Sequence, residues 1–252
     1  MSVWSAVAGD GDDLIVLVHG SLDRSAGMSK LSRRLARCFT VVRYDRRGYG
    51  RSTPHEGPFT MDGQVEDLLE VIGAAPSHDR CIVVGHSYGG NVALTAVDRY
   101  PGTIDAVATF ESPLSWMPWW EGSAGAHAME VSDPEEAAER FMRRLIGDDR
   151  WERLPSATRD ARRSEGIAML GELGDLRAGA PWRPEHITVP VVVMYGEHGQ
   201  PHHRRGAETL GRLLPDVTVE MVPGARHFGP NTHPDEVAAR VVDFVDARVV
   251  AR

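Results

Sequence analysis

Residues 85–90 read Gly85-His86-Ser87-Tyr88-Gly89-Gly90, and this stretch decides the fold of the chain. It follows the apolar run 81–84 and precedes a helix-period segment, so Ser87 is expected on a sharp strand-to-helix turn. Glycines are needed at 85 and 89 because the backbones on either side of such a turn pack too closely for side chains. The turn exposes the Ser87 hydroxyl at a helix N-terminus, which favours developing negative charge. The stretch therefore predicts that Ser87 is a nucleophile.

Other short apolar runs alternate with helix-period segments along the chain. With the run that leads to Ser87, they are Leu14–Val18, Val41–Tyr44, Cys81–Gly85, Ala106–Phe110, Val191–Tyr195 and Val217–Val222. They are continuous and rich in Val and Ile, which is typical of strands buried on both faces of a parallel sheet. The alternation predicts an α/β fold with a doubly wound, mostly parallel sheet.

The alternation is interrupted once, between Pro113 and His186, where no strand is predicted. Asp133 and Pro134 suit the N-cap and first turn of a helix, and a looser helical stretch follows from 156 to about 173. We therefore expect one core, residues 1–112 and 187–252, with a helical cap inserted at 113–186. The aromatic run 116–120 either lines an apolar pocket or packs the cap on the core.

Two further motifs follow predicted strands. His19-Gly20-Ser21 comes after the run 14–18, and a backbone N–H of Ser21 could join that of Tyr88 as an oxyanion-hole donor. His227 lies in the stretch 224–228, after the last predicted strand and before the last predicted helix. A serine hydroxyl needs an imidazole to remove its proton, so His227 is the predicted general base.

With these motifs in place, the chain resembles the α/β-hydrolase superfamily over essentially its whole length. Residues 45–52, DRRGYGRS, resemble the D-x-R-G-x-G-x-S turn of that family, and we expect a structural role for them. The wording of 44–52 and 85–93 is similar to esterase-like and cofactor-free haloperoxidase-like members. The resemblance implies the fold, the cap, and chemistry that requires no cofactor and no metal.

Two departures from the family pattern concern the first strand and the acid. Only residues 3–7 precede the strand at Leu14, so the first strand of the family is expected to be missing or abbreviated. The family carries Asp in a G-x-x-D motif, but residues 196–199 here read Gly-Glu-His-Gly. Glu111, which ends the run 106–110, is the preferred acid, and Glu197 is the alternative; the third possibility is that neither serves.

The bulk composition narrows the partners and the location. The net charge of −8 disfavours nucleic acid, and no apolar run approaches the roughly 20 residues of a membrane span. The first 13 residues lack the pattern of a signal peptide, so a cytoplasmic protein is expected. Cys38 and Cys81 are predicted to be reduced, partly buried thiols. His198, His202 and His203 are predicted to form a solvated loop rather than a metal site.

The leading hypothesis is hydrolysis of a small, fairly apolar ester, thioester or lactone through an acyl-enzyme on Ser87. The partner is then a small-molecule substrate, and the oligomeric state stays open. A second hypothesis keeps the fold but performs C–C bond cleavage, perhydrolysis or a biosynthetic tailoring step. A third hypothesis is a non-catalytic protein that binds a small molecule, and the missing aspartate of the G-x-x-D motif favours it.

Overall fold

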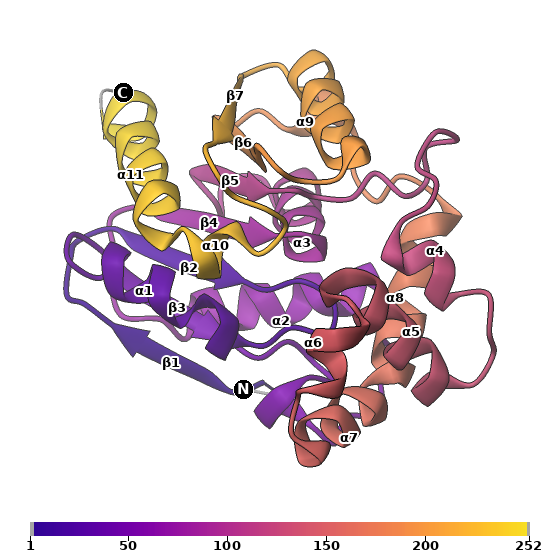
Figure 1. Cartoon of the computed structure of the whole chain (residues 1–252). Helices are drawn as coiled ribbons and strands as arrows, with labels where there is room; N and C mark the ends of the chain where they lie inside the picture. Colours follow the sequence, from indigo (N-terminus) through magenta and orange to yellow (C-terminus); the bar gives the residue numbers. More distant parts are fainter. Residues whose placement is uncertain (1–2, 251–252) are drawn as a thin grey trace.

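A seven-stranded sheet forms the centre of the molecule (Figure 1). In this computed structural model, which describes residues 3–250, the strand order is β1-β3-β2-β4-β5-β6-β7. Only β1 runs antiparallel to its neighbour. The strands are β1 (Ser5–Ala8), β2 (Leu14–Val18), β3 (Thr40–Tyr44), β4 (Cys81–His86), β5 (Ala106–Phe110), β6 (Val191–Gly196) and β7 (Val217–Val222). The predicted α/β fold with a mostly parallel sheet is confirmed, while residues 1–2 and 251–252 of the expected core lie outside the described part.

The central strands are buried because helices cover both of their faces. Every residue of β2, β4 and β5 is buried, which explains why these runs are continuously apolar instead of alternating. In the parallel register Val16 lies between Val42 and Val83. The N-terminal strand β1 has four residues and pairs with β3 at the edge of the sheet.

The helices around the sheet divide between its two faces. Helices α1 and α11 pack on one face through Leu31, Val237 and Phe244, among other residues. Helices α2, α3 and α9 pack on the other face through residues such as Val65 and Leu210. The bounds are α1 (Ser29–Leu35), α2 (Met61–Gly73), α3 (Tyr88–Arg99), α9 (Pro201–Leu213), α10 (Gly229–Thr232) and α11 (Pro234–Val245). Single 3-10 turns lie at Ser25–Met28, Gly50–Ser52 and Pro184–His186, and a π turn at Asp246–Val250.

The chain between β5 and β6 contains helices and loops but no strand. We call residues 113–186 of it the helical segment. In Figure 1 its helices gather at one side of the molecule, away from α11. They are α4 (Ala124–Ala128), α5 (Pro134–Ile146), α6 (Asp148–Glu152), α7 (Ser156–Ser164) and α8 (Gly166–Ala178). Asp133 caps α5 by accepting a hydrogen bond from the Glu136 N–H at 2.8 Å. The segment packs around an apolar cluster that includes Trp151 and Met169 and also takes in Leu22 and Tyr49 from outside the segment.

The structure bears on the two cysteines and on the expected absence of a membrane span. Cys81 is buried in β4, but Cys38 is exposed, so the prediction that both thiols are partly buried is wrong for Cys38. Helix α1 ends at Leu35, so Cys38 lies in the following turn and does not take part in the packing of the helix against the sheet. Among residues 3–250, no helix has the length and the apolar character that crossing a membrane requires.

A fully buried ion pair joins the helical segment to the sheet. Arg46, just after β3, donates to both carboxylate oxygens of Glu172 on α8, at 2.7 and 3.3 Å. Neither side chain has any exposed surface. Tyr49 donates its hydroxyl to the same carboxylate at 2.7 Å, and the Arg46 Nε–H donates to the backbone oxygen of His19 at 2.9 Å. Through this network, Arg46 and Tyr49 of the turn at 45–52 hold α8 against the sheet, which is a structural role.

Removing one partner of this pair should destabilise the fold strongly, because the other charge is left buried and unpaired. We expect Glu172→Gln to lower the free energy of unfolding by about 3–5 kcal/mol. The double variant Arg46→Met/Glu172→Leu should recover at least half of that loss. Urea denaturation measures both, with Glu136→Gln as a control that breaks the exposed Arg140–Glu136 pair and costs less than about 1 kcal/mol. Equal losses in Glu172→Gln and Glu136→Gln would contradict the prediction.

Candidate active site

Ser87 sits on the turn between β4 and α3 in a strained conformation. Its φ of 53° lies in the left-handed region, which non-glycine residues rarely adopt. Its N–H donates to the Phe110 oxygen at 2.8 Å, which ties the turn to the end of β5. A Cβ at Gly85 would lie 2.5 Å from the Gly89 oxygen, and one at Gly89 would lie 2.2 Å from the Val18 oxygen. Both glycines are therefore required by close backbone contacts.

The loop after β2 lies directly against this turn. A Cβ at Gly20 would lie only 2.8 Å from the Ser87 Cβ. The described residues offer no hydrogen-bond acceptor to the N–H groups of Ser21 and Tyr88. His19 fixes the loop, because its Nδ1–H donates to the Gly20 oxygen at 2.8 Å and its Nε2 accepts from the Arg46 N–H at 2.9 Å. The two segments that meet at Ser87 thus each carry an unpaired backbone donor.

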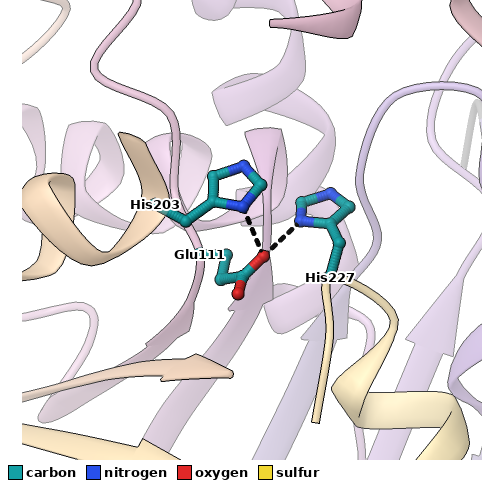
Figure 2. Close-up of side chains that lie close together, drawn as sticks. All are labelled: Glu111, His203 and His227. Atoms are coloured by element: carbon teal, nitrogen blue, oxygen red, sulfur yellow. Dashed lines mark hydrogen bonds and ion pairs between the residues drawn. The ribbon is translucent and has the colours of Figure 1, made fainter. Parts of the chain in front are cut away.

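Glu111 and His227 meet at the carboxyl end of β5 (Figure 2). The Nδ1–H of His227, in the loop after β7, donates to Oε2 of Glu111 at 2.7 Å. The other carboxylate oxygen accepts from the Gly196 N–H at the end of β6, at 3.0 Å. Glu111 has no exposed side-chain surface, and its φ of 49° is again left-handed. Buried charge and backbone strain together are typical of a functional position.

The charge state of Glu111 follows from its contacts. Burial by itself would raise the pKa of its carboxyl group, but the contacts with His203 and His227 outweigh burial and hold this pKa below its usual range. Because an ionised carboxylate only accepts hydrogen bonds, Nδ1 of His227 must carry the hydrogen. Its Nε2 is then free to accept a proton, as a general base requires.

The structure places the alternative acid, Glu197, elsewhere. Glu197 is exposed and accepts a hydrogen bond from the Gly224 N–H at 2.8 Å, and no ion pair joins it to His227. The neighbouring Gly199 explains why the family's aspartate is missing. A Cβ at position 199 would lie 2.3 Å from Oε1 of Glu111, so the carboxylate of Glu111 fills the space that a side chain at 199 would need.

His203 is a site residue that the sequence did not reveal. It was expected in a solvated loop, but it lies in the first turn of α9 and is buried, which corrects that expectation. Its Nδ1 lies 2.6 Å from Oε2 of Glu111, and its ring stacks on the ring of His227 at 4.6 Å and 17°. Burial lowers the pKa of His203 below its usual value, although Glu111 opposes this. The sequence offered one signal for His203, namely that it closely follows residues 196–199, where the family carries its acid.

Ser87 and His227 line one cavity of about 150 Å³, together with Ser21, Tyr88 and His203. Its opposite wall comes from α4, α5 and α8 of the helical segment. The aromatic run 116–120 divides between its two expected roles. Trp120 lines the cavity and also belongs to the apolar cluster between the sheet and α2, α3 and α9, against which Trp116 and Trp119 pack.

Comparison with known proteins agrees with this arrangement. Residues 15–240 match the Alpha/beta hydrolase family. The chain belongs to this family. Several of the proteins that this chain matches are named as hydrolases, esterases or lipases, which supports hydrolase activity.

Two curated relatives and one solved structure illustrate the range of this α/β-hydrolase family. A 2-(acetamidomethylene)succinate hydrolase of Mesorhizobium japonicum is 25% identical, and the match covers 93% of this chain and 88% of that protein. A pimeloyl-[acyl-carrier protein] methyl ester esterase of Nitrosospira multiformis is 23% identical, with 97% and 98% covered. The enol-lactonase of Burkholderia xenovorans superposes with a TM-score of 0.71 at 24% identity, covering 97% and 96% of the chains.

One group in this α/β hydrolase has donor atoms that a metal ion could use. Potential ligand atoms of Glu111, His203 and His227 lie within 4.8 Å of one another. Imidazole and carboxylate are ligands that zinc accepts. Both Nδ1 atoms already contact the same carboxylate oxygen, however, so a cation would have to compete with the contact that orients His227. These residues suit a proton-transfer network better than a resident metal.

His86 contacts His227 and should make the stability of the fold depend on pH. Its Nε2–H donates to the His227 oxygen at 2.8 Å, and its ring lies 4.8 Å from the ring of His227. Burial, with a contribution from His227, lowers the pKa of His86 from 6.5 to about 3. Between these two values the unfolded chain binds the proton more readily than the folded one, so stability decreases as the pH falls below 6.5.

We therefore expect the free energy of unfolding to fall on acidification, with His86 contributing about 1.4 kcal/mol for each pH unit below its unfolded value. Urea denaturation at pH 7.0, 6.0 and 5.0 measures this for wild type and His86→Gln, which should show a smaller slope. His198→Gln, which changes an exposed histidine, is the control. An unchanged slope in His86→Gln would refute the assignment.

Proposed function

We propose that this α/β hydrolase cleaves a small carboxylic ester, thioester or lactone through an acyl-enzyme intermediate on Ser87. The observation that carries the proposal is the 2.7 Å hydrogen bond between His227 and a buried, ionised Glu111, in a cavity that His227 shares with Ser87. The nucleophile Ser87, the acid Glu111 and the base His227 follow one another in the chain order of the family. Relatives named as an ester esterase and an enol-lactonase support this class of substrate.

The chemistry assigns a role to each residue. The Ser87 oxygen attacks the acyl carbonyl while Nε2 of His227 takes the hydroxyl proton, and Glu111 stabilises the imidazolium that forms. The N–H groups of Ser21 and Tyr88 would bind the oxyanion, each worth roughly 3 kcal/mol of barrier. His227 then protonates the leaving group. A water molecule, deprotonated by the same imidazole, releases the acid and restores Ser87.

The size and lining of the cavity limit the acyl group. A cavity of about 150 Å³ suits a compact group, since a space of this size holds a molecule such as benzene. Trp120, Phe141 and Leu173 supply apolar walls. The proposal is therefore directed at short acyl chains and small lactones.

Turnover of p-nitrophenyl acetate and butyrate tests the assignment of the three residues. We expect Ser87→Ala to abolish turnover and Glu111→Gln to lower kcat by about 10³–10⁴, because a neutral amide no longer favours the required tautomer of His227. Glu197→Gln is the matched control on the other candidate acid and should stay within about threefold of wild type. A fluorophosphonate probe should label wild type and spare Ser87→Ala. A wild type that is neither active nor labelled would refute catalysis by Ser87.

Moving the acid provides an independent test. Glu111→Gly/Gly199→Asp removes the carboxylate from β5 and places one after β6, in the space that Glu111 vacates. We expect kcat/KM for p-nitrophenyl butyrate to be at least tenfold higher in this double variant than in Glu111→Gly. In the single variant Gly199→Asp the new side chain meets Glu111, so both activity and thermal stability should fall. A double variant no better than Glu111→Gly would show that Glu111 is not replaceable as an acid in this way.

A further inference from the structure

The cavity beside Ser87 has a charge opposite to that of the whole chain. The sequence carries a net charge of −8, yet no aspartate or glutamate lines this cavity. Its lining includes three arginines instead, namely Arg144, Arg177 and Arg226. Guanidinium groups around a concave, partly apolar site attract anions and bind carboxylates in a planar, bidentate geometry.

Arg177, on the last turn of α8, is the most deeply placed of the three. It is half-buried, and its Nε is fully buried without a hydrogen-bond partner. Its guanidinium group donates a 3.3 Å hydrogen bond to Oγ of Ser123. Desolvation lowers the pKa of its guanidinium group. A half-buried cation without a counter-ion is unfavourable, so its position calls for an anion that enters the cavity.

Two other arginines of the helical segment share one carboxylate partner, unlike the arginines of the cavity. Arg143 and Arg163 both pair with Glu139 at 2.7 Å, on the side of α5 that faces α7. Arg144 is adjacent to Arg143 but lines the cavity, and its one hydrogen bond is to the Gly122 oxygen at 3.4 Å. Among the described residues, no carboxylate lies at ion-pair distance from Arg144, Arg177 or Arg226. Three arginines without a carboxylate partner thus line the cavity that Ser87 also lines.

We propose that this cavity binds acyl substrates that carry a second, free carboxylate, and that Arg177, with Arg144 beside it, holds this group at the end away from Ser87. The inference rests on the proposed function, since it assumes that the reacting carbonyl lies at Ser87. It adds a substrate class, the half-ester or lactone of a short dicarboxylic acid. The apolar walls then contact the methylene chain between the two carbonyl groups.

Matched substrates test the proposal by turnover. The mono-p-nitrophenyl ester of adipate and p-nitrophenyl hexanoate have acyl chains of equal length and differ in the terminal carboxylate. Wild type should show a kcat/KM at least tenfold higher for the half-ester. Arg177→Met should lower the ratio of the two kcat/KM values about tenfold to a hundredfold, as expected for losing a hydrogen bond to a charged group. Arg212→Met, an exposed change on α9, is the control and should leave the ratio unchanged.

Calorimetric binding of adipate and of hexanamide separates this site from the reaction. Wild type and Ser87→Ala should bind adipate at least tenfold more tightly than hexanamide, and Arg177→Met should lose this difference. Inert esters with Arg177-dependent binding of adipate would refute the proposed hydrolysis and support the anion site. Equal binding of adipate and hexanamide by wild type, or an unchanged ratio in Arg177→Met, would overturn the anion site even if the esters are hydrolysed.

Discussion

The buried carboxylate of Glu111 is the constraint around which the site is arranged. An ionised group without exposed surface must have its oxygens satisfied, and here Gly196, His203 and His227 supply the contacts. These partners come from three separate segments, namely the end of β6, the start of α9 and the loop after β7. One charge at the end of β5 therefore fixes the relative positions of all three. The same contacts select the tautomer of His227 that leaves Nε2 available.

A second buried charge, that of Arg46, connects this site to the helical segment. Its guanidinium group binds Glu172 on α8 and lies over the ring of Tyr88 at 4.8 Å, while its backbone N–H fixes the ring of His19. Of the two proposed oxyanion donors, Ser21 lies in the loop that follows His19 and Tyr88 begins α3, and Arg46 contacts both His19 and Tyr88. A displacement of α8 would therefore also displace the groups that Arg46 contacts beside the Ser87 turn. This coupling follows from burial, since a desolvated ion pair tolerates little change in geometry.

The sequence predicted the sheet and the Ser87 turn because both depend on local patterns. Continuous apolar runs identify buried parallel strands, and close backbone contacts impose glycine at 85 and 89. Chain order left Glu111 and Glu197 both open, since it does not tell which carboxylate faces His227. His203 was missed because its role depends on α9 bringing a histidine back over the end of β5. The unpaired state of Arg177 was equally invisible, because pairing between arginines and carboxylates is decided by packing.

The position of the acid follows from the order of the strands. Because β5 and β6 are neighbours in the sheet, their carboxyl ends lie side by side, and a carboxylate after either strand can approach the imidazole that follows β7. The two positions compete for one space, since a Cβ at 199 would lie 2.3 Å from Oε1 of Glu111. The glycine at 199 and the glutamate at 111 therefore depend on each other, because the carboxylate of Glu111 needs the space that a side chain at 199 would occupy. With Glu111 as the proposed acid, no acid is needed after β6, and Gln200 in that loop and His202 at the start of α9 line the cavity.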